Sequence, residues 1–159
     1  MKERHQVIPR TLCLIENQGK VLLIEFSENK GAMQGFFNCP GGHIEFGEGI
    51  IENAEKEILE ETGLKVAGTK LRGVIHSTNF FGKDIILFIT LSTTDLVEFI
   101  DSDEGKLHWV DLDKLDQVNL IEDVKIIFNK LSVIGENDIF TAKSEFDGGG
   151  KLLKMEFES

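Results

Sequence analysis

The chain has 159 residues, a formal net charge of −11 and a hydrophobic content of 41%. This length and composition fit one globular domain with a sizeable core, and no apolar run approaches the roughly 20 residues of a membrane span. Acidic residues outnumber basic ones by 28 to 17, so we expect no nucleic-acid polymer as a partner. Two cysteines are too few for a disulfide framework, which favours a cytoplasmic location.

The first half of the chain predicts a hairpin, a loop and a helix. Residues 6–26 read as two extended segments joined by a glycine-containing turn at residues 17–20. Residues 27–42 are rich in glycine and predict a loop. From residue 49 to 62, apolar side chains recur at helical spacing, and Gly63 is placed to end this helix.

The second half begins with a further hairpin, whose strands are residues 65–80 and 84–93. Residues 106–112 predict a short strand, and residues 120–135 predict an amphipathic helix. Residues 140–157 read as two extended pieces around a run of glycines, most simply a terminal hairpin. Hairpins combined with two helices predict an α+β or a layered α/β fold. The pattern does not indicate the strand order.

The predicted helix at residues 49–62 is unusually rich in glutamate. At about 100° per residue, Glu57, Glu60 and Glu61 share roughly a 100° arc of its surface. Like charges at this spacing destabilise a bare helix by a few tenths of a kcal/mol, and these three lie near its C-terminus, the unfavourable end for anions. A solvated acidic face is the simplest interpretation of such a helix alone. Bound divalent cations, which prefer carboxylate oxygens, are the alternative.

A tight Pro-Gly-Gly loop just upstream favours the second interpretation. Residues 40–42 allow the backbone to turn sharply enough to point a carbonyl, that of Gly42, at the same cations. A magnesium ion held there would polarise a phosphoryl oxygen and lower the pKa of a bound water. Each feature alone is common, whereas the two at a fixed spacing are a rare combination.

Residues 42–64 resemble the Nudix box, G-x5-E-x7-R-E-U-x-E-E-x-G-U, where U is aliphatic. The matching residues are Gly42, Glu48, Glu57, Ile58, Glu60, Glu61, Gly63 and Leu64. One specified position departs from the pattern, because Lys56 stands where the box has arginine. Residues 35–42 and 104–115 are also similar to the segments that flank this box.

The resemblance implies an α/β fold of the Nudix type, an α/β/α sandwich with a mixed β-sheet in which the box forms a loop-helix-loop. A Nudix hydrolase domain would span residues 1–136. The resemblance does not explain residues 137–159, which would form a C-terminal β-hairpin extension of the same domain. A structural role is the simplest one for this hairpin, and a homodimer contact is the alternative.

The resemblance also implies a metal site and assigns its ligands. Glu57, Glu60 and Glu61 would hold Mg²⁺ or Mn²⁺ and act in catalysis, with the carbonyl of Gly42 as a further metal ligand. Glu104 would be a further catalytic residue, either a ligand or a general base.

The same resemblance assigns supporting roles around this metal site. Glu48 would orient the loop rather than bind metal. Lys56 keeps the charge of arginine without its planar fork, so this loop would be held less rigidly and activity would be lower.

The implied activity is a Mg²⁺-dependent, MutT-like pyrophosphohydrolase. In it, water attacks a small nucleotide, most simply a (d)NTP or oxidised (d)NTP, to give NMP and pyrophosphate. Hydrolysis of ADP-ribose or another nucleotide sugar is one alternative. A catalytically inactive Nudix-like nucleotide-binding module is another. The remaining candidates for phosphate contacts are basic residues, although a solvated side chain is the simpler interpretation of each: Arg10, Lys30, Arg72 and Lys83.

Overall fold

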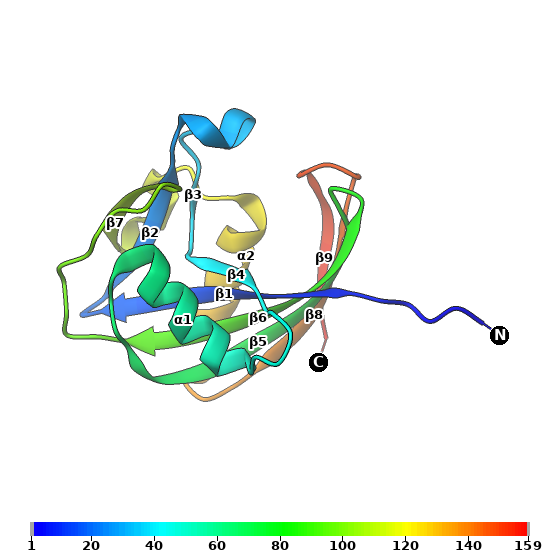
Figure 1. Cartoon of the computed structure of the whole chain (residues 1–159), viewed down its shortest axis with the longest axis horizontal. Coiled ribbons are helices and arrows are strands. Elements are labelled where there is room, and N and C mark those ends of the chain that lie inside the picture. The colour runs from blue at the N-terminus through cyan, green and yellow to red at the C-terminus, as the bar shows by residue number, and fades with distance from the viewer. Residues whose placement is uncertain (1, 159) are drawn as a thin grey trace.

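A mixed β-sheet forms the centre of the protein in the computed structural model, which describes residues 2–158 (Figure 1). The helices are α1 (Ile50–Thr62) and α2 (Glu122–Leu131), with two short 3-10 helices, η1 (Glu28–Met33) and η2 (Leu112–Gln117). The strands are β1 (Ile8–Asn17), β2 (Lys20–Phe26), β3 (Phe37–Asn38), β4 (Gly41–His43), β5 (Ala67–Phe80), β6 (Lys83–Thr93), β7 (Gly105–Asp111), β8 (Phe140–Phe146) and β9 (Leu152–Glu158).

The strand order is β3-β2-β1-β6-β5-β8-β9, with β4 also pairing with β1 and β7 with β2. The pairs β1–β6 and β5–β8 are parallel, whereas the predicted hairpins β1–β2, β5–β6 and β8–β9 are antiparallel. Both classes of pairing therefore occur in one sheet, as the sequence predicted.

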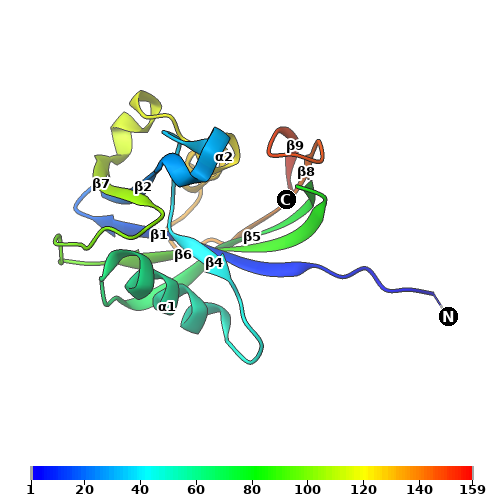
Figure 2. The same cartoon turned by 45° about the horizontal axis from the view of Figure 1, so that its top comes forward.

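One helix covers each face of this sheet. Side chains alternate along a strand, so Leu14 of β1 packs in the cluster that contains Ile127 of α2. Its neighbour Ile15 packs in the cluster that contains Ile58 of α1. Figure 2 shows the result, with α1 below the sheet and α2 above it. The predicted α/β/α sandwich is confirmed.

The segment predicted as a loop, residues 27–42, is more regular than expected. It contains η1, β3 and the start of β4. Strand β4 pairs with β1 in the register Thr11↔Gly42. The glycines indicated irregular structure, but hydrogen bonding to the neighbouring strand decides the local conformation. This pairing fixes the glycine loop against the central strand.

The terminal hairpin continues the sheet through the pairing of β8 with β5. Its tip contacts the tip of the β5–β6 hairpin. The ring centroids of Phe80 and Phe146 lie 4.9 Å apart, and the Phe81 amide donates a hydrogen bond to the Gly149 carbonyl. Both tips rise on the side of the sheet that carries α2 (Figure 2).

Across residues 2–158, neither helix has the length and apolar character that crossing a membrane requires.

Candidate active site

Helix α1 presents the glutamates of the predicted site. At the start of α1, the Glu52 carboxylate accepts a hydrogen bond from the Gly49 amide at 2.9 Å. At its end, Gly63 adopts a left-handed conformation with φ of 74°. Ala54 and Ile58 bury one side of the helix against the sheet. This packing fixes the rotation of the helix, so that Glu61 is buried while Glu60 remains exposed.

Glu61 is the most deeply placed of these carboxylates, at 8% exposure. The main-chain amide of Gly41 donates to it at 2.8 Å. Burial and the nearby Glu104 carboxyl raise the pKa of Glu61 to about 9. Burial and Glu60 also raise the pKa of Glu57. The carboxylates therefore destabilise one another's charged forms.

Gly42 leaves the space that Glu57 occupies. A Cβ atom at residue 42 would lie 2.6–2.8 Å from the three carboxyl atoms of Glu57. The missing side chain thus lets the Glu57 carboxylate lie directly against the loop backbone. The structure brings Gly42 and Glu57 together, as the sequence-based interpretation of the loop requires.

The chemistry of this cluster fits a hard divalent cation. Its donors are carboxylate and carbonyl oxygens, the ligands that Mg²⁺ and Mn²⁺ prefer. A cation would offset the burial and the repulsion that raise the pKa values of Glu57 and Glu61. Among residues 2–158, no three His, Cys, Asp or Glu side chains are already arranged to hold a metal ion. Side-chain rotation of the glutamates would therefore accompany binding.

Glu48 and Lys56 form an ion pair that supports the loop. The Lys56 ammonium lies 2.6 Å from the Glu48 carboxylate, which also accepts the Glu45 amide at 2.7 Å. The hydrogen bond from Lys56, with those from the Glu45 amide and the Asn53 side chain, lowers the pKa of Glu48 to about 2. Lys56 thus contacts Glu48, the residue that the sequence assigned to loop orientation.

Asn53 is a site residue that the sequence analysis missed. Its fully buried amide donates to the His43 carbonyl at 2.8 Å and to Glu48 at 3.0 Å, and it accepts from the Thr11 hydroxyl at 2.7 Å. It therefore ties α1 to β1 and β4 at once. A signal was available, because Asn53 lies beside Ala54 on the apolar face of the helix, where a lone polar residue must find buried partners.

A cavity of about 280 Å³ opens beside Glu61 and Glu104. Its far wall is aromatic and comes from Phe80, Phe81 and Phe146 of the two hairpin tips, while Asn38 and Asp123 add polar groups from β3 and α2. The remaining lining includes Arg10, Leu12, Lys30, Met33, Ile85, Leu87 and Gly150. Lys30 pairs with Glu104 at 3.4 Å. The cavity is therefore continuous with the carboxylate cluster.

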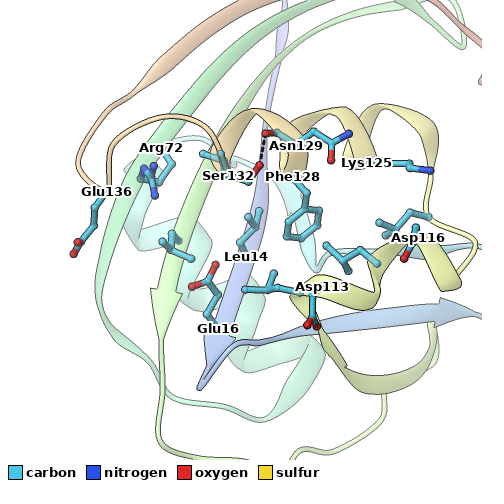
Figure 3. Close-up of a pocket in the computed structure, with 15 residues that line it drawn as sticks. Leu14, Glu16, Arg72, Asp113, Asp116, Lys125, Phe128, Asn129, Ser132 and Glu136 are labelled. Carbon is cyan, nitrogen blue, oxygen red and sulfur yellow. Dashed lines mark hydrogen bonds between the residues drawn. The ribbon is translucent and has the colours of Figure 1, made fainter.

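A larger cavity, about 460 Å³, lies between α2, η2 and the end of β1 (Figure 3). None of the predicted catalytic glutamates lines it. Arg72 at its edge is buried, and its guanidinium donates to the Gly135 and Asp138 carbonyls, both at 2.9 Å. The expectation of a solvated Arg72 is wrong, because this side chain anchors the connection between α2 and β8.

A family model of the NUDIX domain matches residues 6–129, and the chain belongs to the Nudix hydrolase family. The resemblance found in residues 42–64 is thereby confirmed. Members of this family generally use divalent metal ions.

Individual relatives differ in what their names say they act on. The oxidized purine nucleoside triphosphate hydrolase of Danio rerio is 34% identical over 107 residues, covering 66% of this chain and 67% of that protein. An uncharacterized Nudix hydrolase of Bacillus subtilis is 27% identical over 110 residues, 66% of each chain. The ADP-ribose pyrophosphatase of Methanocaldococcus jannaschii is 42% identical over 64 residues, 40% of this chain and 37% of that protein. The chain thus spans about two thirds of the first two relatives and much less of the third.

A solved structure matches nearly the whole chain. The MutT protein of Bacillus halodurans superposes with a TM-score of 0.82 at 26% identity, covering 96% of this chain and 98% of that one. The match therefore reaches into the terminal hairpin, which lies beyond the residues that the NUDIX domain model matches.

Proposed function

We propose that the protein is a Mg²⁺-dependent pyrophosphohydrolase that cleaves a (d)NTP, or an oxidised (d)NTP, to NMP and pyrophosphate. One observation carries the proposal. The buried Glu61, fixed by the Gly41 amide, lies beside Glu104 at the edge of a cavity whose far wall is aromatic. A phosphate chain and a nucleobase thus each have a chemically suitable place.

Glu57, Glu60 and Glu61, with the Gly42 carbonyl, would hold Mg²⁺ or Mn²⁺. A bound divalent cation supplies charge neutralisation to the phosphates and lowers the pKa of water. The protein contributes carboxylates on a rigid helix and a loop fixed by Asn53. These supports limit the reorganisation that substrate binding demands.

In the proposed reaction, water forms a new bond to one phosphorus of the α–β anhydride, that P–O–P bond breaks, and the leaving phosphate group departs with the bonding electron pair. The proton of the water passes to a carboxylate. Glu104 is our candidate for this general base, because it lines the cavity, and Lys30 at 3.4 Å holds it in place. Its loop lies outside the helix that holds the proposed ligands, so it can approach from another direction.

The cavity supports a nucleoside triphosphate as substrate. Phe80, Phe81 and Phe146 offer faces for stacking on a base, and Asn38 and Asp123 offer hydrogen-bonding groups. The Danio rerio relative is named for oxidised purine triphosphates, which favours this substrate class. The Methanocaldococcus jannaschii relative, named for ADP-ribose, favours ADP-ribose as the second candidate.

We also propose that residues 1–136 and the hairpin at residues 137–159 form one domain, because β8 continues the sheet. Cys13 and Cys39 are free and buried, which supports a reducing compartment such as the cytoplasm. A homodimer through the hairpin stays a prediction.

Product analysis tests the proposed function. The protein is incubated with Mg²⁺ and a panel of nucleotides, and products are separated by chromatography. Monophosphate and pyrophosphate from a triphosphate support the leading proposal. AMP and ribose phosphate from ADP-ribose would support the second candidate. Absence of any product with both Mg²⁺ and Mn²⁺ would favour a nucleotide-binding module.

A further inference from the structure

Arg10 lies in the wall of the cavity beside the proposed catalytic carboxylates. It belongs to β1, where it pairs with His43 of β4 on one side and Leu87 of β6 on the other. The next residue, Thr11, directs its hydroxyl to Asn53 of α1. Because successive side chains of a strand point to opposite faces, Arg10 points to the face that carries α2 and the hairpin tips.

The Arg10 guanidinium has an unused donor. Its Nε atom is buried without a hydrogen-bond partner, a state that only one other side-chain atom, Thr90 Oγ1, shares among residues 2–158. The Thr90 hydroxyl lies beside the Cys13 thiol, whereas Arg10 has no ion-pair partner in the described chain. Buried donors are rarely left unpaired, and a missing partner, either water or a ligand, is one of the few explanations.

Lys30 provides the comparison within the same cavity. These two residues are the cations that line it. Lys30 already pairs with Glu104 at 3.4 Å, so its charge is compensated. Arg10 lacks such a carboxylate, and the protein as a whole carries an excess of acidic residues. Of the two cations that line this cavity, Arg10 is therefore the one whose charge has no carboxylate partner.

The surroundings of Arg10 favour a nucleobase over a phosphate as its partner. Its neighbours in the cavity include Ile85 and Leu87, and the aromatic tips close the same end. Of the three proposed glutamate ligands, Glu61 lines the cavity, whereas Glu57 and Glu60 lie outside it. Phosphates held at those glutamates would place the base toward the apolar and aromatic side, where Arg10 lies.

We propose that Arg10 is a specificity-determining residue whose guanidinium donates a hydrogen bond to a carbonyl oxygen of the nucleobase. A guanidinium can only donate hydrogen bonds, so it selects for an acceptor on the base edge. This inference rests on the proposed nucleotide substrate and adds to it a preference for bases that carry such a carbonyl.

A pair of nucleotides that differ at one carbonyl tests the proposal. Inosine triphosphate carries the 6-carbonyl, with the N1–H of the same lactam, that purine riboside triphosphate lacks, while their sugars and phosphates are identical. We expect wild-type kcat/KM to favour inosine triphosphate by at least ~10-fold, the range of a charge-assisted hydrogen bond. Arg10→Met is expected to bring this ratio to about 1 by lowering kcat/KM for inosine triphosphate alone. Arg4→Met, which removes an exposed arginine, is expected to leave the ratio unchanged.

Two results would overturn the proposal. Equal losses of kcat/KM on both nucleotides in Arg10→Met would mean a phosphate contact or a structural role. A preference that is absent in the wild type, or unchanged in the variant, would mean no contact with the base carbonyl. Arg10→Leu also removes every side-chain donor, so it must lose the preference as well, and it replaces Arg10→Met if that variant does not fold. Calorimetric titration with the two monophosphates repeats the comparison without turnover. If neither triphosphate is cleaved while selective binding persists, the proposed reaction fails and the role of Arg10 stands.

Discussion

The main-chain amide of Gly41 donates a 2.8 Å hydrogen bond to the carboxylate of Glu61. This contact joins β4 to the last turn of α1, so the glycine loop and the glutamate helix are held as one unit. It also places a buried carboxylate where burial and Glu104 disfavour its charge. A bound cation would therefore favour the charged form of Glu61.

Replacing Glu61 by glutamine removes one proposed metal ligand and keeps the side-chain shape. We expect Glu61→Gln to lower kcat by at least ~10²-fold while the far-UV circular dichroism spectrum stays that of the wild type. Near-wild-type turnover would refute the assignment of Glu61 to the metal site.

The same substitution should change how the stability of the metal-free protein depends on pH. The pKa of Glu61 is raised from 4.5 to about 9, so the folded state retains a proton that the unfolded state has lost. Stability from this group is complete below about pH 4.5 and falls as pH rises toward 9. In EDTA, Glu61→Gln should match the wild-type Tm near pH 4.5 and exceed it at pH 8. A lower Tm of the variant at pH 8 would show that the raised pKa is wrong.

Gly41 and Gly42 are adjacent in the loop, and alanine substitutions at these two positions form a matched pair of variants. A Cβ at residue 42 meets only the flexible carboxyl end of Glu57, whereas one at residue 41 overlaps the Thr11 carbonyl of β1. Gly42→Ala should therefore lower activity at least ~10-fold with less than about 1 kcal/mol lost in stability, because the Glu57 side chain rotates away. Gly41→Ala should destabilise the fold by about 1–3 kcal/mol. Urea unfolding and turnover measured on both variants check this, and equal effects in the two would contradict it.

Asn53 should matter for stability as well as for activity. Truncation leaves the His43 carbonyl and the Thr11 hydroxyl without the partner they have at 2.8 and 2.7 Å. At about 1–3 kcal/mol for each of these two unsatisfied groups, we expect Asn53→Ala to lose about 2–6 kcal/mol in chemical denaturation. Asn129→Ala, an exposed position on α2, is the control and should change stability by less than about 0.5 kcal/mol. Similar losses in both would show that Asn53 is not a structural anchor.

Lys56 departs from the family pattern, and its contact with Glu48 at 2.6 Å explains why the charge is kept. Arginine can hold the same carboxylate with two parallel hydrogen bonds. We expect Lys56→Arg to preserve or raise kcat and Lys56→Met to lower it, as measured by steady-state turnover. A large loss in Lys56→Arg would overturn this account of the residue.

Local patterns predicted much of the fold because hairpins and helices are encoded by near neighbours in the chain. Gly63 ends α1 as expected, since its left-handed conformation costs glycine little. The parallel pairing of Arg10 with Leu87 joins strands far apart in sequence, and no local signal specifies it. The aromatic wall of the cavity was not predicted for the same reason, because Phe80 and Phe146 are far apart in the sequence and come into contact only when the sheet forms.

At the site, the box residues were assigned through the resemblance of residues 42–64 to the Nudix box, and their roles as metal ligands stay predictions. Asn53 was overlooked although its place on the apolar face was a signal, and its partners on β1 and β4 became visible only in the folded structure. The unpaired Arg10 likewise became visible only when its neighbours in the cavity were known.

The most direct test of the account is the Mg²⁺ dependence of nucleoside triphosphate cleavage, followed by anion-exchange chromatography of the products. We predict NMP and pyrophosphate from the wild-type protein with Mg²⁺, no turnover after EDTA, and recovery when Mg²⁺ is returned. Turnover that continues in EDTA, or NDP and phosphate as products, would contradict the central claim that the Glu57, Glu60 and Glu61 cluster supports metal-dependent pyrophosphohydrolysis.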